Sequence, residues 1–327
     1  MKINEYFRGK LIMDSGNSLN YISYFLETMP PFLSAKLYGS FLTSPDALKK
    51  GEIRQIDLIL AVDNIEEFYR ECVSKNPYMY RMIPSLFFSH ATQDQLKMLG
   101  TSCYTSHINF MDNYYKMGVI EKDDLIADLK EWKTFFMAGR FQKEMMTLKR
   151  DCDIEEANII NKKNAVIAAF LLLNKDNPSL GEFYQTLCSL SYIGDERIRL
   201  HAEDPNKQVK LAQNSKNFFD TQYTAICSYY DVLDDGTIIY NYEDILRQVV
   251  SLPQDLRYRL YDVMKLYFGE EDQVIRLNIA KEIYDYLFQK TSKASRDQIL
   301  KGVITTGPVN SVHYTLAKLK KGRMKGN

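Results

Sequence analysis

The sequence lacks paired cysteines, clustered histidines and an excess of charge, and each absence narrows the possible functions. The five cysteines are an odd number, lie far apart and include no CxxC pair, which favours free thiols in a reducing compartment over a disulfide framework. The four histidines show no zinc-binding spacing. Lysine plus arginine number 42 and aspartate plus glutamate also number 42, so no global field attracts nucleic acid and any anion site must be local.

Long apolar runs are also missing. The longest, "AVIAAFLLL" at residues 165–173, has nine residues, whereas a membrane-spanning helix needs about 20. The first residues, "MKINEYFRGK", contain neither the apolar core of a signal peptide nor the Ser/Arg-rich composition of a transit peptide. Any contact with a membrane should therefore be peripheral.

The chain of 327 residues is long enough for two domains. Hydrophobic periodicity predicts that strands and helices alternate in the first half and that helices dominate the second half. We expect boundaries that give domains of residues 1–155 and 156–292 and a distinct C-terminal segment, 293–327. The predicted strands are 35–39, 55–63, 114–120 and a short one within 234–242; the predicted helices are 21–29, 64–77, 121–139, 157–176, 179–194, 242–252 and 278–292.

Two neighbouring segments of the first half point to phosphate chemistry. "AKLYGS" ends a predicted strand in Gly39-Ser40, where glycine lets a ligand approach the backbone and the serine hydroxyl can donate to phosphate oxygens. "QIDLILAVD" then places Asp57 inside an apolar strand, where an ionised carboxylate needs a cation or a metal. Mg²⁺ prefers one or two carboxylates plus substrate phosphates. The pair is typical of polymerase-β-type nucleotidyltransferases; the alternative is a tight turn and an aspartate paired with a buried Lys or Arg.

Longer motifs carry a family resemblance. "YGS" (38–40), "IDLILAVD" (56–63), "KMGVI" with "DLIADLKEWKTFFMAGRFQK" (116–143), "LSYIGDERIRL" (190–200) and "LKGVITTG" (300–307) follow one another in order. In these segments the chain resembles the mitochondrial translocator assembly and maintenance family, the soluble phosphatidate cytidylyltransferases (CDP-diacylglycerol synthases). The resemblance extends from about residue 35 to residue 322.

The resemblance implies an α+β fold: a polymerase-β-type nucleotidyltransferase domain, a mostly helical, winged-helix-like domain and a C-terminal amphipathic helix. It implies transfer of CMP from CTP to phosphatidic acid with Mg²⁺, for phosphatidylglycerol and cardiolipin synthesis, and no nucleic-acid partner. By position, the implied residues are Tyr38, Gly39, Ser40, Arg140 and Lys143 for CTP, Asp57 and Lys116 for catalysis, and Asp57 for the metal. Asp128 also matches a family position.

The chain departs from the polymerase-β pattern at one position. Many such enzymes place a second acid two residues after the first, where this chain has Ile59. Asp63 lies on the same strand face but about 20 Å further along, at ~3.3 Å per residue. A second metal ligand, if there is one, must therefore come from elsewhere, and Asp112 is one candidate.

The C-terminal tail predicts contact with an anionic membrane surface. Apolar residues recur at helical spacing and basic residues follow without an acid, which is typical of interfacial helices. The alternative is a helix docked on the protein and a solvated end. The apolar positions are Val309, Val312, Leu316 and Leu319, and the basic positions are Lys318, Lys320, Lys321, Arg323 and Lys325.

Two rival functions stay open at this point. One is a nucleotidyltransferase with a non-lipid acceptor, which has no need of the basic tail. The other is a non-catalytic assembly factor, against which an intact Asp57 and Lys116 argue. Because no transit peptide is visible, we expect a bacterial protein on the cytoplasmic face of its membrane, whereas mitochondrial relatives would act at the matrix face of the inner membrane.

Overall fold

The computed structural model describes residues 16–43, 55–76, 101–111, 113–200, 203–224, 226 and 229–306. They form an α+β protein that divides into two compact units. The sheet unit takes its residues from 1–125, 144–155 and 297–314, and the helical unit takes the remaining residues. This assignment divides helices α6, α8 and α15 within their lengths. None of the helices in the described ranges is long and apolar enough to cross a membrane.

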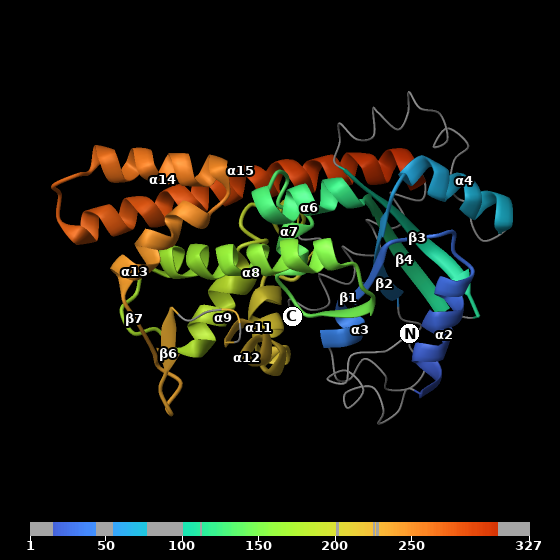
Figure 1. The fold of residues 1–327 in the computed structure, drawn as a ribbon, viewed down its shortest axis with the longest axis horizontal. Helices are drawn as coiled ribbons and strands as arrows, with labels where there is room; N and C mark the ends of the chain where they lie inside the picture. The colour runs from blue at the N-terminus through green and yellow to red at the C-terminus, as the bar shows by residue number, and fades with distance from the viewer. Residues whose placement is uncertain are drawn as a thin grey trace. The chain divides into compact units, whose positions relative to one another are not determined.

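The sheet unit contains one mixed five-stranded sheet with the order β3-β4-β2-β1-β5 (Figure 1). Among the described strands of this sheet, only β2 and β4 pair in parallel, and the other neighbours are antiparallel. The strands are β1 Ser34–Tyr38, β2 Gln55–Val62, β3 Ser102–Phe110, β4 Asn113–Glu121 and β5 Met145–Lys149, and the helices within the unit are α2 Gly16–Glu27, α3 Ser40–Thr43 and α4 Ile65–Lys75. The predicted strands at 35–39, 55–63 and 114–120 are confirmed, and β3 and β5 were not predicted.

The side chains of β2 alternate between a face that packs into the apolar core and the opposite face. Ile56, Leu58, Leu60 and Val62 are buried in one apolar cluster with side chains of α2 and α4. Since successive side chains of a strand point to opposite faces, Asp57 lies on the face away from this cluster. Helix α4 begins as expected, because the side chain of Asn64 accepts the amide of Glu67 at 2.9 Å.

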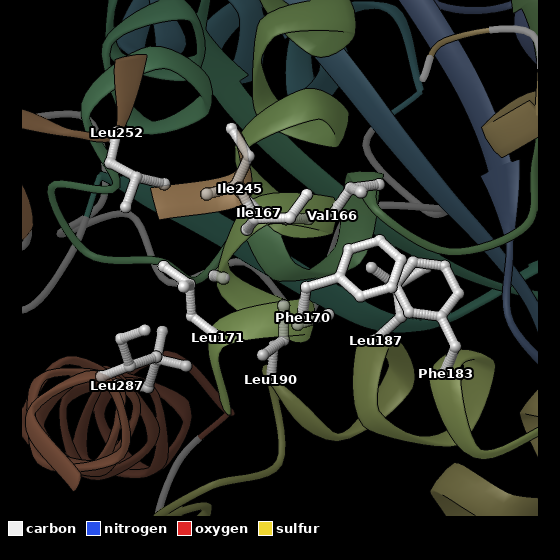
Figure 2. Packing of buried hydrophobic residues seen from close by; sticks show 14 of the residues in the cluster. Val166, Ile167, Phe170, Leu171, Phe183, Leu187, Leu190, Ile245, Leu252 and Leu287 are labelled. Carbon is white, nitrogen blue, oxygen red and sulfur yellow. The ribbon is translucent and has the colours of Figure 1, made fainter. Parts of the chain in front are cut away.

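The helical unit is built around α8, Cys152–Leu173. Its residues 165–171 are all buried, and Figure 2 shows Val166, Ile167, Phe170 and Leu171 among apolar side chains of other segments. The run "AVIAAFLLL" is thus part of a protein core, where a helix can be apolar all round. The other elements are α6 Lys122–Glu131, α7 Ala138–Phe141, α9 Leu180–Ser189, α10 Glu196–Arg199, α11 Lys207–Asn214, α12 Lys216–Thr224, β6 Tyr230–Val232, β7 Ile238–Tyr240, α13 Tyr242–Arg247, the 3-10 helix η3 Gln248–Ser251, α14 Gln254–Leu266 and α15 Asp272–Thr306.

Polar contacts join α14 to the part of α15 within the helical unit, and the two helices lie side by side in Figure 1. The guanidinium group of Arg259 reaches Glu282 at 3.2 Å, and Lys290 reaches Asp255 at 3.3 Å. The predicted helices at 157–176, 179–194 and 278–292 are confirmed with shifted ends, and the short strand within 234–242 is β7, paired with β6.

The predicted single helix over residues 121–139 is wrong. Helix α6 ends at Glu131, and α7 begins at Ala138. Trp132 and Phe135 between them have positive φ angles of 48° and 59°. Both side chains are buried, so their spacing in the sequence continues the apolar pattern of a helix. The two residues nevertheless lie in a turn. The predicted helix at 242–252 likewise divides, into α13 and η3.

Candidate active site

The first part of the site is the turn at the end of β1. Gly39 has a φ of +85°, in the left-handed region that favours glycine. The amides of Leu42 and Thr43 donate to the Gly39 carbonyl oxygen at 3.0 and 3.3 Å, so the chain turns at once into α3. Ser40, the first residue of α3, is exposed. A hydroxyl at this position is available to a ligand.

Asp57 lies directly against this turn. Its backbone pairs with Tyr38 of β1, and a β-carbon added to Gly39 would stand 2.7 Å from Asp57 Oδ2. The side-chain amide of Gln55 is 3.5 Å from Oδ1. The expectation of a core aspartate needs correction: Asp57 is half-buried, because it lies on the face of β2 opposite the apolar cluster. Residue 39 must be glycine both for its φ angle and for this close approach.

Lys116 lies on the other side of Asp57. Strand β4 pairs in parallel with β2, and its register places Lys116 next to Asp57. Tyr38, Asp57 and Lys116 therefore form one row across three strands. The Lys116 amine lies 5.0 Å from the ring centroid of Tyr104, which belongs to β3. Sequence analysis missed Tyr104, since no local motif marks it.

The next row of the same face carries an internal ion pair. Lys36 pairs in register with Ile59, is buried, donates to Thr147 Oγ1 at 2.7 Å and forms an ion pair with Glu155. Burial lowers the pKa of Lys36, while Glu155 opposes the shift. The position where many polymerase-β-type nucleotidyltransferases carry a second acid is thus apolar, and the charge beside it is balanced within the protein. Nothing in the sequence pattern indicated this pair.

The residues present fit a magnesium ion that is held mainly by substrate. Asp57 offers one carboxylate beside a turn that has room only for glycine. Within the described ranges, no group of three or more histidine, cysteine or acidic side chains could hold a metal by itself. Mg²⁺ commonly takes one or two carboxylates and completes its shell with phosphates and water. Asp63 is exposed beyond the end of β2, and Asp112 lies outside the described residues.

Asp128 organises the turn between α6 and α7. This buried carboxylate accepts the amides of Thr134, Phe135, Met137 and Ala138 at 2.6, 2.9, 2.8 and 3.1 Å. Four backbone donors on one carboxylate account for the break in the predicted helix, because they replace the bonds that a continuous helix would make. The arrangement also fixes the start of α7, which carries the "AGR" residues.

Arg140 and Lys143 come after that turn in the chain and belong to the helical unit. The guanidinium group of Arg140 donates to the Phe136 carbonyl oxygen at 2.6 Å and lies 3.6 Å from the centroid of the Phe136 ring. Lys143 donates to Ser191 Oγ at 2.5 Å. A β-carbon on Gly139 would stand 2.4 Å from the Ser191 β-carbon, so glycine is required for Ser191 to come this close.

Hydrogen bonds join the "LSYIGDERIRL" segment to α15. Asp195 accepts a hydrogen bond from Ser295 at 3.0 Å, and Glu196 accepts one from Ser292 at 2.9 Å. Asp195 also forms an ion pair with Arg197 at 2.5 Å. Burial acts to raise the pKa of Asp195, but the bonds and charge of Arg197 outweigh it and hold the pKa at about 2. The segment thus keeps its charges paired near neutral pH.

The predicted site residues fall into two sets. The structure brings together Tyr38, Gly39, Asp57 and Lys116 in the sheet unit, with Ser40 next in the chain. Asp128, Arg140 and Lys143 form the second set, in the helical unit. The predicted membrane residues of the tail, 308–327, lie outside the described residues.

The first set defines an α+β protein equipped to hold a phosphate-bearing ligand, with a glycine–serine turn, an acid and a lysine side by side. Comparison with known proteins narrows this class. The family model described as "Phosphatidate cytidylyltransferase, mitochondrial" matches residues 22–321, and the chain belongs to this family of enzymes. The family expected from the sequence motifs is thereby confirmed.

Individual relatives agree with the family model. The chain is 27% identical to the mitochondrial phosphatidate cytidylyltransferase of Schizosaccharomyces pombe, over 94% of this chain and 83% of that protein. It is 28% identical to the Saccharomyces cerevisiae protein of the same name, over 87% of this chain and 65% of that protein. The protein of that name from Dictyostelium discoideum is 27% identical, with 87% of this chain and 77% of that protein covered.

Proposed function

We propose that this protein transfers CMP from CTP to phosphatidic acid, which yields CDP-diacylglycerol and pyrophosphate. The observation that carries the proposal is the row of Tyr38, Asp57 and Lys116 against the Gly39 turn, in a chain that belongs to the phosphatidate cytidylyltransferase family. We assign the sheet unit to the polymerase-β type of nucleotidyltransferase domain. The helical unit, with its β6–β7 hairpin, is assigned as winged-helix-like.

The reaction needs few catalytic groups. A phosphate oxygen of phosphatidic acid bonds to the α-phosphorus of CTP, the bond from that phosphorus to the bridging oxygen breaks, and pyrophosphate leaves with the electron pair. The attacking phosphate is already anionic near neutral pH, so no strong general base is required. What the protein must supply is orientation of two polyanions and stabilisation of the charge that develops on the leaving group.

The described residues can provide these functions. The Ser40 hydroxyl and the amides at the start of α3 hold CTP phosphates, and Lys116 neutralises phosphate charge beside Asp57. Tyr104 lies next to the Lys116 amine and restricts where that charge can move. Asp57, together with substrate phosphates, would hold Mg²⁺, and the ion supplies electrostatic stabilisation of the phosphates when bound. Arg140 and Lys143 are assigned to phosphate binding as well.

The test uses CTP labelled in its cytidine moiety and phosphatidic acid in detergent. Label that becomes soluble in organic solvent identifies a lipid acceptor. In the same assay, Asp57→Asn and Lys116→Met should each lower turnover by about 100-fold or more while the thermal transition is retained, because each removes charge stabilisation but keeps the shape. Asp63→Asn, an exposed acid beyond β2, and Lys75→Met, an exposed lysine of α4, are the matched controls.

The outcomes separate the rival functions. Labelled product that stays in the aqueous phase when other acceptors are supplied would support a non-lipid nucleotidyltransferase. Absence of any CTP-dependent product from well-folded protein would support an assembly factor. Full activity in a folded Asp57→Asn variant would contradict the assignment of Asp57 as the metal ligand.

A further inference from the structure

Tyr104 belongs to a second row of residues, next to the row that contains Asp57. The register of the strands aligns Lys36, Ile59, Gly118 and Tyr104, in that order, across β1, β2, β4 and β3. The first three lie two positions along their strands from the residues of the first row, and side chains two positions apart share a face of the sheet. The second row therefore borders the proposed site on the same face.

Gly118 leaves space for the ring of Tyr104. A β-carbon built on Gly118 would stand 2.6 Å from Cε1, 2.7 Å from Cζ and 3.1 Å from the hydroxyl oxygen of Tyr104. These atoms form the far end of the ring, so the side chain reaches from β3 across to β4 and its hydroxyl end lies over Gly118. The backbone of Gly118 is outside the left-handed region, so the ring of Tyr104 is what requires glycine at this position.

The other members of the second row offer little to a polar ligand. Ile59 is apolar and buried, and Gly118 has no side chain. Lys36 is buried, and its charge is paired within the protein. Tyr104 is half-buried, and its ring centroid lies 5.0 Å from the amine of Lys116 in the first row. In this row, the Tyr104 hydroxyl is thus the polar group that can turn toward a ligand held at Lys116.

From this arrangement we infer that Tyr104 is a catalytic residue whose hydroxyl donates a hydrogen bond to a substrate phosphate held at Lys116. Gly118 is then a positioning residue that acts through Tyr104. A tyrosine hydroxyl can donate to a phosphate oxygen without a change of protonation, and a hydrogen bond to a charged oxygen is about twice as strong as one between neutral groups. The inference rests on the proposed function for the identity of the ligand, which is a phosphate of CTP or that of phosphatidic acid.

The variant Tyr104→Phe tests the hydroxyl alone, because it keeps the ring beside Lys116 and over Gly118. Transfer of labelled CMP to short-chain phosphatidic acid should slow by about 10- to 100-fold, while the thermal transition is retained. Tyr115→Phe is the matched control and should keep wild-type turnover. Tyr115 precedes Lys116 on β4, faces the apolar cluster and has a buried hydroxyl with no hydrogen-bond partner among the described residues.

Binding measurements identify which phosphate the hydroxyl contacts. The affinity of each variant is measured by calorimetry for CTP, for pyrophosphate and for short-chain phosphatidic acid below its micelle concentration. Weaker binding of CTP and pyrophosphate to Tyr104→Phe identifies the phosphates of the nucleotide. Weaker binding of phosphatidic acid alone identifies the acceptor. A lower turnover at unchanged affinities places the hydrogen bond in the transition state.

A double-mutant cycle tests the role of Gly118. Gly118→Ala should slow transfer at least as much as Tyr104→Phe, because the added carbon displaces the ring. In a Tyr104→Ala background, where the ring is absent, Gly118→Ala should cause no further loss of turnover per folded molecule. Gly181→Ala is the glycine control, since its added β-carbon would meet only Ser179 Oγ, at 3.9 Å, and it should keep wild-type turnover.

Wild-type turnover of folded Tyr104→Phe would overturn the catalytic role of Tyr104. Equal losses from Gly118→Ala with and without the Tyr104 ring would overturn the positioning role of Gly118. Failure of the proposed function is a different result, because the wild-type protein would then form no lipid-soluble label. In that case CTP binding decides: weaker binding to Tyr104→Phe but not to Tyr115→Phe would still support the contact, and equal binding to both would contradict it.

Discussion

Asp57 Oδ2 occupies the space that a side chain on residue 39 would need, since a β-carbon built on Gly39 would stand 2.7 Å from this oxygen. The two residues are 18 positions apart, and the pairing of Tyr38 with Asp57 brings them together. The left-handed φ of Gly39 and the position of the carboxylate are therefore one structural feature. A ligand phosphate bound at the turn and a cation bound at Asp57 would therefore depend on the same structural feature.

Gly39→Ala should abolish transfer and lower stability. The left-handed conformation costs a residue with a β-carbon about 1–2 kcal/mol, and the contact with Asp57 adds to this by displacing the carboxylate. Gly236→Ala is the matched control, because Gly236 has a similar φ of +81° and no atom within 4 Å of its added β-carbon. Thermal melting and the transfer assay are applied to both variants.

The control separates strain from displacement. Gly236→Ala should lose stability through strain alone and keep normal turnover per folded molecule. If Gly39→Ala has the same turnover as Gly236→Ala, then the position of the Asp57 carboxylate does not matter for transfer, and the proposed site is wrong.

The sequence predicted the parts of this site that are local and missed those that depend on distant contacts. Glycine after a strand, serine next to it and an acid in the neighbouring strand are visible within one segment. The position of Lys116 beside Asp57 comes from the register of the parallel strands β2 and β4, which the structure supplies. The Lys36–Glu155 pair joins residues 119 positions apart, and no periodicity records such a contact.

The break between α6 and α7 shows a second limit of pattern reading. Trp132 and Phe135 are buried, so they satisfy the apolar period of a helix although both have positive φ angles. The helix ends where it does because the buried carboxylate of Asp128 accepts four backbone amides of the following turn. A polar residue on the apolar side of an amphipathic pattern was the available signal, and its meaning depended on the fold.

Asp128→Asn should destabilise the protein by about 2–4 kcal/mol, because an amide NH₂ group would replace an oxygen that accepts two backbone N–H groups and would leave buried donors unsatisfied. Chemical denaturation of the two proteins measures this difference. Asp123→Asn, at an exposed position in the first turn of α6, is the control and should change stability by less than about 1 kcal/mol, because only its interaction with the helix dipole is lost. Unchanged stability of Asp128→Asn would show that the amide network contributes little.

Lys143 should make stability rise with pH in a defined window. Its pKa is about 7 in the folded protein and 10.5 in its ordinary state. Between these values the unfolded chain binds the extra proton, so raising the pH favours the folded state by up to about 1.4 kcal/mol per pH unit. Below pH 7 both states are protonated, and the cost of the enclosed charge is fully present. The free energy of unfolding, measured from pH 6.5 to pH 10, should therefore rise less in Lys143→Met than in the wild type.

The same measurement with Lys210→Met controls for the loss of one lysine charge from the protein. Equal slopes for wild type and Lys143→Met would mean that the Lys143 amine remains protonated throughout this range.

Neutralising the tail should separate membrane binding from chemistry. Replacement of Lys318, Lys320, Lys321, Arg323 and Lys325 by glutamine removes five basic charges, and each such charge near an anionic membrane is worth about 1 kcal/mol. Co-flotation of the variant with vesicles that contain phosphatidic acid should fall well below that of the wild type, and wild-type flotation should weaken at high salt. Transfer to short-chain phosphatidic acid in solution should be unchanged, because the residues proposed for chemistry lie elsewhere in the sequence.

A charge-matched control decides whether the tail itself matters. Glutamine at five exposed lysines outside the tail, Lys75, Lys130, Lys163, Lys216 and Lys281, changes the net charge by the same amount. If only net charge governed binding, both variants would lose flotation equally. If the tail variant floats as well as the wild type, another surface meets the lipid, and the apolar spacing of Val309, Val312, Leu316 and Leu319 then reflects docking on the protein. Loss confined to the tail variant, together with normal transfer in solution, would make this segment the membrane contact of an enzyme whose substrate resides in the bilayer.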